Sequence, residues 1–163
     1  MLLGSMEAGG TKMVLCIGDE EQHIFERETI STTSPEETME KILAFFQGKG
    51  IRALGIGSFG PLDLNRRSST YGYITTTPKT LWRNFPLLPQ LRSALRVPVE
   101  IDTDVNAAAL SEYALGAAQG FNSCLYVTVG TGIGGGLIAE GNLVHGLVHP
   151  EFGHMLLRVS ADD

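Results

Sequence analysis

Two glycine-rich segments are the residues of this chain best suited to hold a phosphate. In the first, Gly9 and Gly10 precede Thr11 and Lys12 between two short apolar runs. Glycine lets the backbone approach an anion closely, and a hydroxyl and an ammonium group add further donors. Because an apolar strand-like run follows, the segment is not a P-loop, which leads from a strand into a helix. A plain hairpin turn explains the same residues.

The second segment, residues 130–136, holds five glycines in seven residues. Gly130, Thr131 and Gly132 can offer several amides and a hydroxyl to an anion. The spacing superficially resembles a dinucleotide-binding fingerprint, which requires a helix after the turn. The residues that follow, 137–139, have a strand pattern instead, which excludes that kind of site. A flexible loop is the alternative, although five glycines lose more backbone entropy than a simple turn requires.

Acidic and imidazole side chains form two further clusters. Asp102 and Asp104 flank Thr103 where a predicted strand ends and a predicted helix begins. A carboxylate there can accept a proton from a substrate hydroxyl, or it can simply cap the helix. The segment 149–154 holds two histidines and Glu151, which suit hydroxyl recognition or metal ligation but also an ordinary surface loop. A zinc site needs three or four ligands and no cysteine follows Cys124, so the chain cannot complete a metal cage there.

Both helices and strands are predicted to position these residues. Ser34 as N-cap, Pro35 at the first helical position, Glu37 and a terminal glycine at Gly48 predict one helix. Shorter helices are predicted over 88–95 and 105–115, with a polar loop over 65–89. Helices interleaved with several strands make this an α/β or α+β protein. The pattern strand, glycine turn, strand occurs twice, at 2–17 and 124–139, which indicates two related lobes. The glycine-punctuated stretch 116–122 places the domain boundary between 1–117 and 118–163.

Composition excludes several classes of protein. The 163 residues carry 18 acidic and 12 basic side chains, a net charge of -6, which disfavours a broad nucleic-acid surface. No segment has the ~18–20 consecutive apolar residues of a membrane span, and no signal peptide is recognisable. Cys16 and Cys124 lie far apart in apolar runs and are expected to be reduced strand residues. We therefore expect a cytoplasmic protein that binds neither nucleic acid nor membrane.

The order of the motifs, more than any one of them, resembles the ROK family of sugar kinases and repressors, and its bacterial fructokinase branch in particular. The matching segments are Glu7–Lys12, Ser58–Pro61, Thr75–Lys79, Thr103–Ala108, Gly130–Gly134 and Glu151–His154. The resemblance implies an actin-like, ribonuclease-H-like two-lobed kinase fold, with ATP and Mg²⁺ meeting a hexose, most of all fructose, between the lobes. It also implies a homodimer.

Residue roles carry over by position. The resemblance makes Asp104 the catalytic base. It assigns the phosphates to Gly9, Gly10, Thr11, Lys12, Gly130, Thr131 and Gly132. It assigns the sugar to Gly60, Pro61, Lys79, Thr103, Asp104, Glu151 and His154, and makes His154 the first ligand of a structural Zn²⁺.

Departures from the family pattern narrow this interpretation. Glu7 replaces an aspartate that many members carry, and Thr103 and Lys79 replace asparagines of the glucose-handling members, which disfavours glucose.

The family's cysteine-rich zinc motif and most of its second lobe are expected after Asp163, so the chain is a fragment or a naturally short protein that is inactive alone. The alternatives are an inactive module that needs a partner and a sugar-sensing regulator. The regulator is disfavoured because only six residues precede Glu7, too few for a DNA-binding helix-turn-helix.

These expectations predict how the chain handles zinc. A single imidazole holds Zn²⁺ weakly, because a structural site derives its stability from a closed tetrahedral set of ligands. The 163-residue chain purified alone should bind no stoichiometric zinc, whereas the full-length product should bind one ion and lose activity on chelation. Elemental analysis that finds one tightly held zinc per short chain would contradict this expectation and make the 149–154 cluster a complete site.

Overall fold

The computed structural model describes residues 1–130, 132–146 and 153 of the chain. It divides into two compact units, Met1–Asp104 and Val105–Asp163. All but the first residue of the helix α3, Asp104–Leu115, therefore belongs to the second unit. The domain limits expected from the glycine stretch 116–122 stay a prediction.

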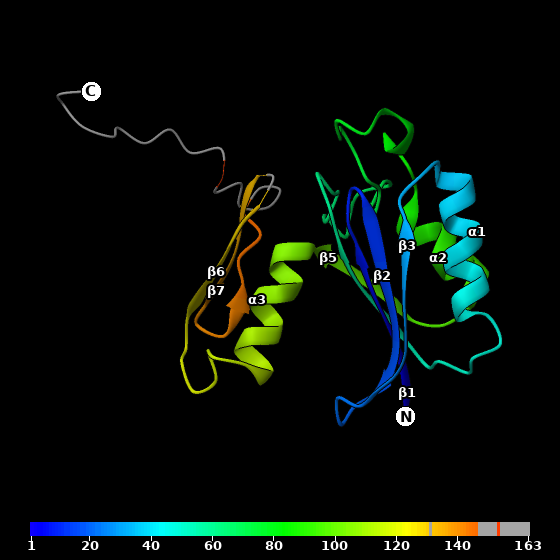
Figure 1. The fold of residues 1–163 in the computed structure, drawn as a ribbon. Coiled ribbons are helices and arrows are strands. Elements are labelled where there is room, and N and C mark those ends of the chain that lie inside the picture. The colour runs from blue at the N-terminus through cyan, green and yellow to red at the C-terminus, as the bar shows by residue number, and fades with distance from the viewer. Residues whose placement is uncertain (131, 147–152, 154–163) are drawn as a thin grey trace. The chain divides into compact units, whose positions relative to one another are not determined.

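A five-stranded mixed sheet organises the first unit (Figure 1). The strands lie in the order β3-β2-β1-β4-β5. β1 pairs antiparallel with β2 and parallel with β4, and β5 extends the parallel half by pairing with β4. Their bounds are β1 Leu2–Ala8, β2 Lys12–Asp19, β3 Ile24–Ser31, β4 Leu54–Ser58 and β5 Val99–Thr103.

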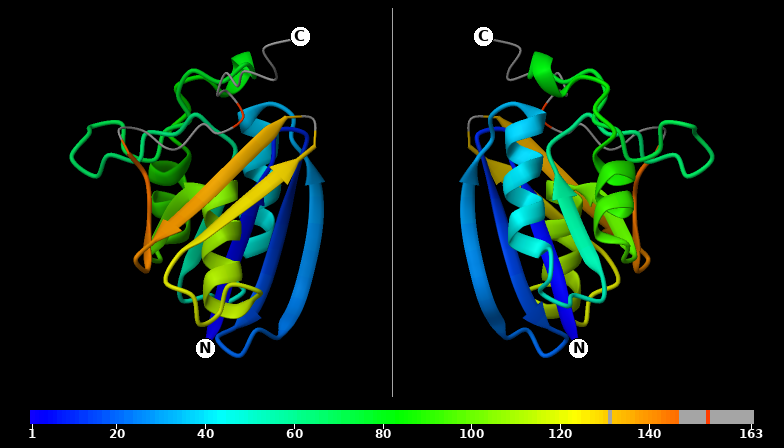
Figure 2. Two further views of the ribbon diagram at one scale, coloured as in Figure 1. Left: turned by 90° about the vertical axis from the view of Figure 1, so that its left-hand side faces the viewer. Right: turned by 90° about the vertical axis from the view of Figure 1, so that its right-hand side faces the viewer.

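The core of the first unit lies on one face of this sheet. Alternate residues of each strand are buried, as in Met13, Leu15 and Ile17 of β2, because successive side chains point to opposite faces. The helices α1, Pro35–Phe46, and α2, Leu87–Leu95, cover this face together, and Figure 2 shows α1 lying along it. The sheet and its two helices therefore form a complete hydrophobic core within one unit.

Helix α1 begins and ends where the sequence predicts. Ser34 is the N-cap, and its hydroxyl accepts the amide hydrogen of Glu37 at 3.3 Å. Pro35 is the first helical residue, and Gly48 follows the C-cap with φ +74°, a conformation that glycine adopts without strain. These local signals are sufficient because capping involves only residues close in sequence.

The segment between β4 and α2 is not the polar loop that its sequence predicts. Leu62, Ile74 and Trp82 are buried to 1% exposure or less, the last within a short 3₁₀ helix, η1, Thr80–Trp82. Ile74 forms isolated β-bridges with both Leu62 and Phe85. The apolar residues are too widely spaced to show a periodicity, yet they fold back together and close the end of the core.

The second unit pairs α3, Asp104–Leu115, with a small antiparallel sheet. Its strands lie in the order β6-β7-β8 and span Cys124–Val129, Ile133–Ala139 and Asn142–Leu143. β6 and β7 form a hairpin around the second glycine segment, as β1 and β2 do around the first, which confirms the predicted repetition. Cys16 and Cys124 are both half-buried and unbridged.

Most of the second glycine segment is strand, not loop. β7 already begins at Ile133, so Gly134 and Gly136 lie within it. A Cβ on Gly136 would lie 2.3 Å from the carbonyl oxygen of Val105 and 2.9 Å from the Cβ of Ala109, both in α3. The glycines of β7 therefore let the helix pack directly on the strand, and of the glycines in this segment only Gly130 and Gly132 precede β7.

Among the described residues, no helix is both long and apolar enough to cross a membrane.

The close packing of α3 on β7 predicts that Gly136→Ala lowers the free energy of unfolding of the second unit by about 1–3 kcal/mol, since the new methyl group meets backbone that cannot move aside. Hydrogen exchange of the β6 and β7 amides measures this. Gly55→Ala in β4 is the matched control, because no atom lies within 4 Å of a Cβ there. Wild-type exchange in the Gly136 variant would show that the helix does not depend on this approach.

Candidate active site

Three chain segments leave the sheet of the first unit at one edge. β1, β4 and β5 run parallel, and Ala8, Ser58 and Thr103 pair in register at their carboxyl ends. The residues that follow these three strands therefore start from adjacent positions. In open α/β sheets, ligands bind outside the carboxyl ends of the strands. This edge brings together the first glycine segment, the Gly60–Pro61 segment and Asp104.

The first glycine segment is a tight turn with two available amides. The amide of Gly9 donates to the carbonyl of Lys12 at 3.0 Å, which closes the turn. Thr32 braces it, because its hydroxyl donates to the Gly9 carbonyl at 2.7 Å and its amide donates to the Thr11 carbonyl at 2.9 Å. Within the described part of the chain, the amides of Gly10 and Thr11 donate to no acceptor, so they can receive an anion.

The segment after β4 is fixed from both sides. The amide of Phe59 donates to the carbonyl of Ala8 at 2.8 Å, which continues the parallel pairing by one residue. The peptide bond between Gly60 and Pro61 is cis. The Pro61 carbonyl accepts two hydrogen bonds from Thr75, from its amide at 2.8 Å and its hydroxyl at 3.0 Å. Gly60 and Pro61 thus have a defined position at the edge.

Asp104 occupies the junction of strand and helix that the sequence predicts. Thr103 ends β5 with 4% exposure, and Asp104, the first residue of α3, is exposed. Asp102 is half-buried and its carboxylate accepts the amide hydrogen of Thr103 at 2.7 Å. The positive end of the helix dipole favours the ionised form of a carboxylate at this position. The exposed carboxylate of Asp104 can serve as an acceptor for a proton, and it can equally stabilise the helix end.

The structure brings Lys79 to the first glycine segment. Its side chain is half-buried and crosses Gly10, so that a Cβ on Gly10 would lie 2.8 Å from the Cε of Lys79. Thr77, with 1% exposure, accepts the amide hydrogen of Lys79 through its hydroxyl at 3.3 Å. Residues 69 positions apart in sequence are thus adjacent at the edge.

The remaining predicted site residues belong to the second unit. The amide of Gly130 donates to the carbonyl of Gly132 at 2.8 Å, which closes the turn between β6 and β7. Thr131, Glu151 and His154 lie outside the described residues. Their roles in binding phosphate, sugar and zinc stay predictions.

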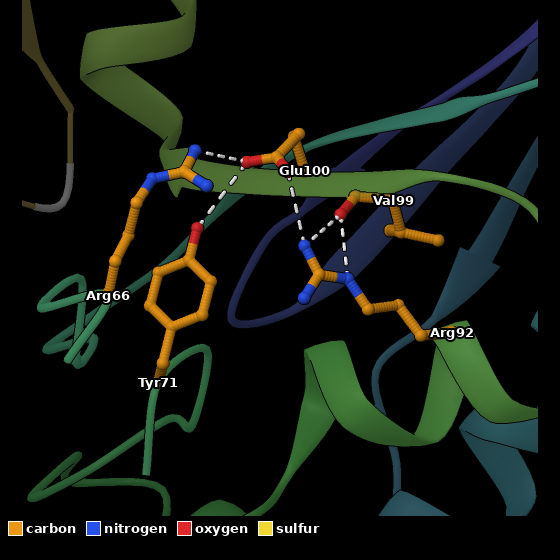
Figure 3. Close-up of polar contacts among 5 residues, drawn as sticks. All are labelled: Arg66, Tyr71, Arg92, Val99 and Glu100. Carbon is orange, nitrogen blue, oxygen red and sulfur yellow. Dashed lines mark hydrogen bonds and ion pairs between the residues drawn. The ribbon is translucent and has the colours of Figure 1, made fainter. Parts of the chain in front are cut away.

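A charged cluster that the sequence does not reveal holds the segment after β4 against β5 (Figure 3). Arg66 donates to one carboxylate oxygen of Glu100 at 2.5 Å, and Arg92 donates to the other at 3.1 Å. Both guanidinium groups also lie within 6 Å of the centre of the Tyr71 ring, at 5.4 and 5.8 Å. Arg92 donates two further hydrogen bonds to the Val99 carbonyl. Arg66 is therefore linked to β5 through Glu100, although its side chain is 70% exposed.

Burial is the main cause that raises the pKa of the Tyr71 phenol, and the negative charge of Glu100 adds to it. Tyr71 therefore stays protonated through the neutral range and donates to Glu100 at 3.4 Å. Arg66 and Glu100 are separated by 33 residues, and no local pattern indicates that they pair.

Asp63 organises the turn that begins this segment. One carboxylate oxygen accepts the Thr70 hydroxyl at 2.6 Å, and the other accepts the Asn65 amide at 3.0 Å. Hydrogen bonding from the hydroxyl of Ser68, and then of Thr70, lowers the pKa of Asp63 below its usual value. The carboxylate stabilises the turn in its ionised form.

Comparison with known proteins identifies the family. A family model described as "ROK family" matches residues 3–162. The chain belongs to the ROK family. It is 50% identical over 162 residues to a Bacillus subtilis protein named "Putative fructokinase", and 46% identical over 159 residues to a fructokinase of Lactococcus lactis. These matches cover 99% and 98% of this chain but 54% of each relative, so the chain spans about half the length of the curated relatives it matches.

A solved ROK structure has the same fold. The Streptomyces griseus ROK glucokinase in complex with glucose and AMPPNP matches with a TM-score of 0.77 and 30% identity, over 99% of this chain and 52% of that one. This confirms the predicted α/β fold class, the actin-like, ribonuclease-H-like fold of ROK sugar kinases. The five-stranded sheet with β1 at its centre is the part of that fold described above.

The hydrogen bonds to Asp63 give a pH prediction. Because the pKa of Asp63 is lowered in the folded chain, its stabilising contribution is present at neutral pH and is lost as pH falls through that lowered pKa, below 3.8. An NMR titration of the carboxyl carbon should give a pKa below 3.8, and Ser68→Ala should raise it toward the ordinary value. Glu40→Gln on the exposed side of α1 should leave it unchanged. An ordinary Asp63 pKa in the wild type would contradict the assignment.

Proposed function

We propose that this chain is part of an ATP-dependent hexose kinase that phosphorylates fructose to fructose 6-phosphate. The observation that carries the proposal is the register of β1, β4 and β5, which puts Asp104 and the first glycine turn at one edge of the sheet. The fructokinase names of relatives at 50% and 46% identity support this substrate. Thr103, where the glucose-handling members carry asparagine, supports it as well.

In this proposal the chain contributes a catalytic base and two glycine-rich segments that bind phosphate. Asp104 accepts the proton of the sugar hydroxyl that attacks the terminal phosphorus of ATP. Gly9–Lys12 holds phosphate through the amides of Gly10 and Thr11 and the Thr11 hydroxyl, and Gly130–Gly132 is assigned the same task with the Thr131 hydroxyl. Phosphoryl transfer depends mostly on positioning and charge neutralisation, so this set is chemically sufficient.

Two metal ions belong to the proposal. Mg²⁺ prefers oxygen donors, and the Asp104 carboxylate and the Thr11 hydroxyl are donors of that type at the sheet edge. When bound with ATP, the ion neutralises phosphate charge. The expected zinc has His154 as its one assigned ligand, which lies outside the described residues. We therefore derive no step from zinc.

Gly60, Pro61, Thr103, Glu151 and His154 are proposed to contact the sugar. Each of these residues offers a backbone group, a hydroxyl, a carboxylate or an imidazole that can bond a sugar hydroxyl. The homodimer and the cytoplasmic location stay predictions.

The proposal predicts a large kinetic effect at Asp104. In the full-length product of the coding sequence, Asp104→Asn should lower kcat for ATP-dependent phosphorylation of fructose by about 10²–10⁴-fold, because the amide cannot accept the proton. The KM for fructose should change far less, as expected for a group that acts in the transition state. A coupled assay of ADP release measures both constants, with Glu40→Gln as the control.

Two results would overturn the proposal. An Asp104→Asn enzyme with near-native kcat would remove Asp104 from the role of base. A wild-type protein that transfers phosphate from ATP to none of fructose, glucose and mannose would remove the kinase function itself. A higher kcat/KM for glucose than for fructose would retain the kinase and reject fructose as its substrate.

A further inference from the structure

We propose that Lys79 is a phosphoryl-binding residue, whose ammonium group holds the transferred phosphoryl oxygens at the first glycine turn, and not a ligand of the sugar. The inference rests on the proposed kinase function and deepens it by naming the group that Lys79 recognises. Four observations carry it: the path of the side chain, the anchoring of its segment, its charge environment and the backbone of Gly10.

The side chain of Lys79 lies directly against Gly10. A Cβ built on Gly10 would lie 2.8 Å from the Cε, 3.7 Å from the Cδ and 3.9 Å from the Nζ of Lys79. Distances under 3.0 Å between such carbon atoms do not occur without displacement. A methyl group on residue 10 would therefore require the flexible end of the Lys79 side chain to shift from its place at the turn.

The backbone at Gly10 does not itself demand glycine. Gly10 is absent from the residues with positive φ, the region in which glycine alone is unstrained. A glycine outside that region is required where another group approaches closely. In this structure the approaching group is the aliphatic part of Lys79, so the glycine and the lysine form one arrangement.

The segment that carries Lys79 is anchored to the same scaffold as the glycine turn. Trp82 is 1% exposed, and its indole donates to the Thr33 carbonyl at 2.9 Å. The neighbouring Thr32 braces the turn through the carbonyls of Gly9 and Thr11. Because one dipeptide of the chain holds both segments, the position of Lys79 relative to the turn is fixed before any ligand binds.

Further hydrogen bonds fix the backbone around Lys79. Its carbonyl accepts the Trp82 amide at 2.9 Å, and its amide donates to the buried Thr77 hydroxyl. The Arg83 side chain donates to the Thr77 carbonyl at 2.8 Å. The backbone is thus held on both sides of Lys79.

The charge of Lys79 has no counterpart in the part of the chain that the structure describes, where it forms no ion pair. Lys49, by comparison, pairs with Glu26 at 2.7 Å. The turn that Lys79 lies against presents the amides of Gly10 and Thr11, which are donors as well. An ammonium group beside two available amides has the chemistry of an anion site, because an anion accepts these hydrogen bonds and also neutralises the positive charge, whereas a neutral sugar hydroxyl accepts the hydrogen bonds and leaves the charge uncompensated.

The chemical step that Lys79 would assist is the transfer of the terminal phosphoryl group of ATP to a sugar hydroxyl. The bond between the terminal phosphorus of ATP and its bridging oxygen breaks, and ADP leaves with the electron pair. A bond forms between phosphorus and the sugar oxygen, whose proton passes to Asp104. Lys79 keeps its proton and stabilises the negative charge on the phosphoryl oxygens, as a pre-positioned cation does in phosphoryl transfer.

The test uses Lys79→Met, Lys79→Arg and Gly10→Ala in the full-length product, with fructose and ATP. Lys79→Met should lower kcat by about 10²–10³-fold, the usual effect of removing one pre-positioned donor, with less than a threefold change in KM for fructose. Lys79→Arg should recover part of the loss.

Gly10→Ala, which displaces the side chain, should cause a similar loss, and the double variant Gly10→Ala with Lys79→Met should be no worse than either alone. Lys41→Met, an exposed lysine of α1, is the control.

Other outcomes would overturn the inference. A higher KM for fructose at unchanged kcat in Lys79→Met would make Lys79 a sugar ligand, and additive losses in the double variant would separate it from Gly10. A readout independent of activity distinguishes failure here from failure of the kinase function. Inorganic pyrophosphate should shift the NMR signals of the Gly10 and Thr11 amides in the wild type and much less in Lys79→Met. Equal shifts in both proteins would exclude Lys79 from anion binding.

Discussion

The parallel pairing of β1 with β4, and of β4 with β5, is the constraint on which the candidate site depends. These strands are separated in sequence by a hairpin, two helices and a long irregular segment, so nothing local brings their ends together. The ladder pairs Ala8, Ser58 and Thr103 across the sheet, and three segments then leave at one edge. A shift of one residue in either pairing would turn the buried residues of a strand to its opposite face and expose part of the core. The hydrophobic core therefore enforces the arrangement of the site.

Glycine has three different physical roles in the two hairpins. At Gly9 a Cβ would lie 2.5 Å from the Lys12 carbonyl oxygen, so glycine is needed to close the turn. At Gly10 glycine admits the side chain of Lys79. At Gly136 it admits the backbone of α3. The repeated pattern of strand, glycine turn and strand is thus built from similar sequence and different contacts.

The parts of the fold that follow from local chemistry are predictable from the sequence. Ser34, Pro35 and Gly48 define α1, and the junction of β5 and α3 around Thr103 follows from strand and capping patterns.

What the sequence could not show depends on distant partners. The role of Gly136 is set by α3 and that of Arg66 by Glu100. The segment 65–89 has no periodicity, yet it carries Ile74 and Trp82 into the core. The resemblance assigns Lys79 to the sugar. The proposal that it binds a phosphoryl group depends on its contact with Gly10, which the sequence does not reveal.

The direct connection between β5 and α3 has a consequence for how such a chain can vary. Thr103 ends the strand, Asp104 begins the helix, and the division between the two units falls immediately after it. There is no spacer residue to absorb an insertion, a deletion or a grafted segment without moving the carboxylate. We therefore expect natural relatives and engineered variants to carry no insertion or deletion between β5 and α3. We expect the glycine stretch 116–122, which follows the helix, to accept such changes without moving Asp104.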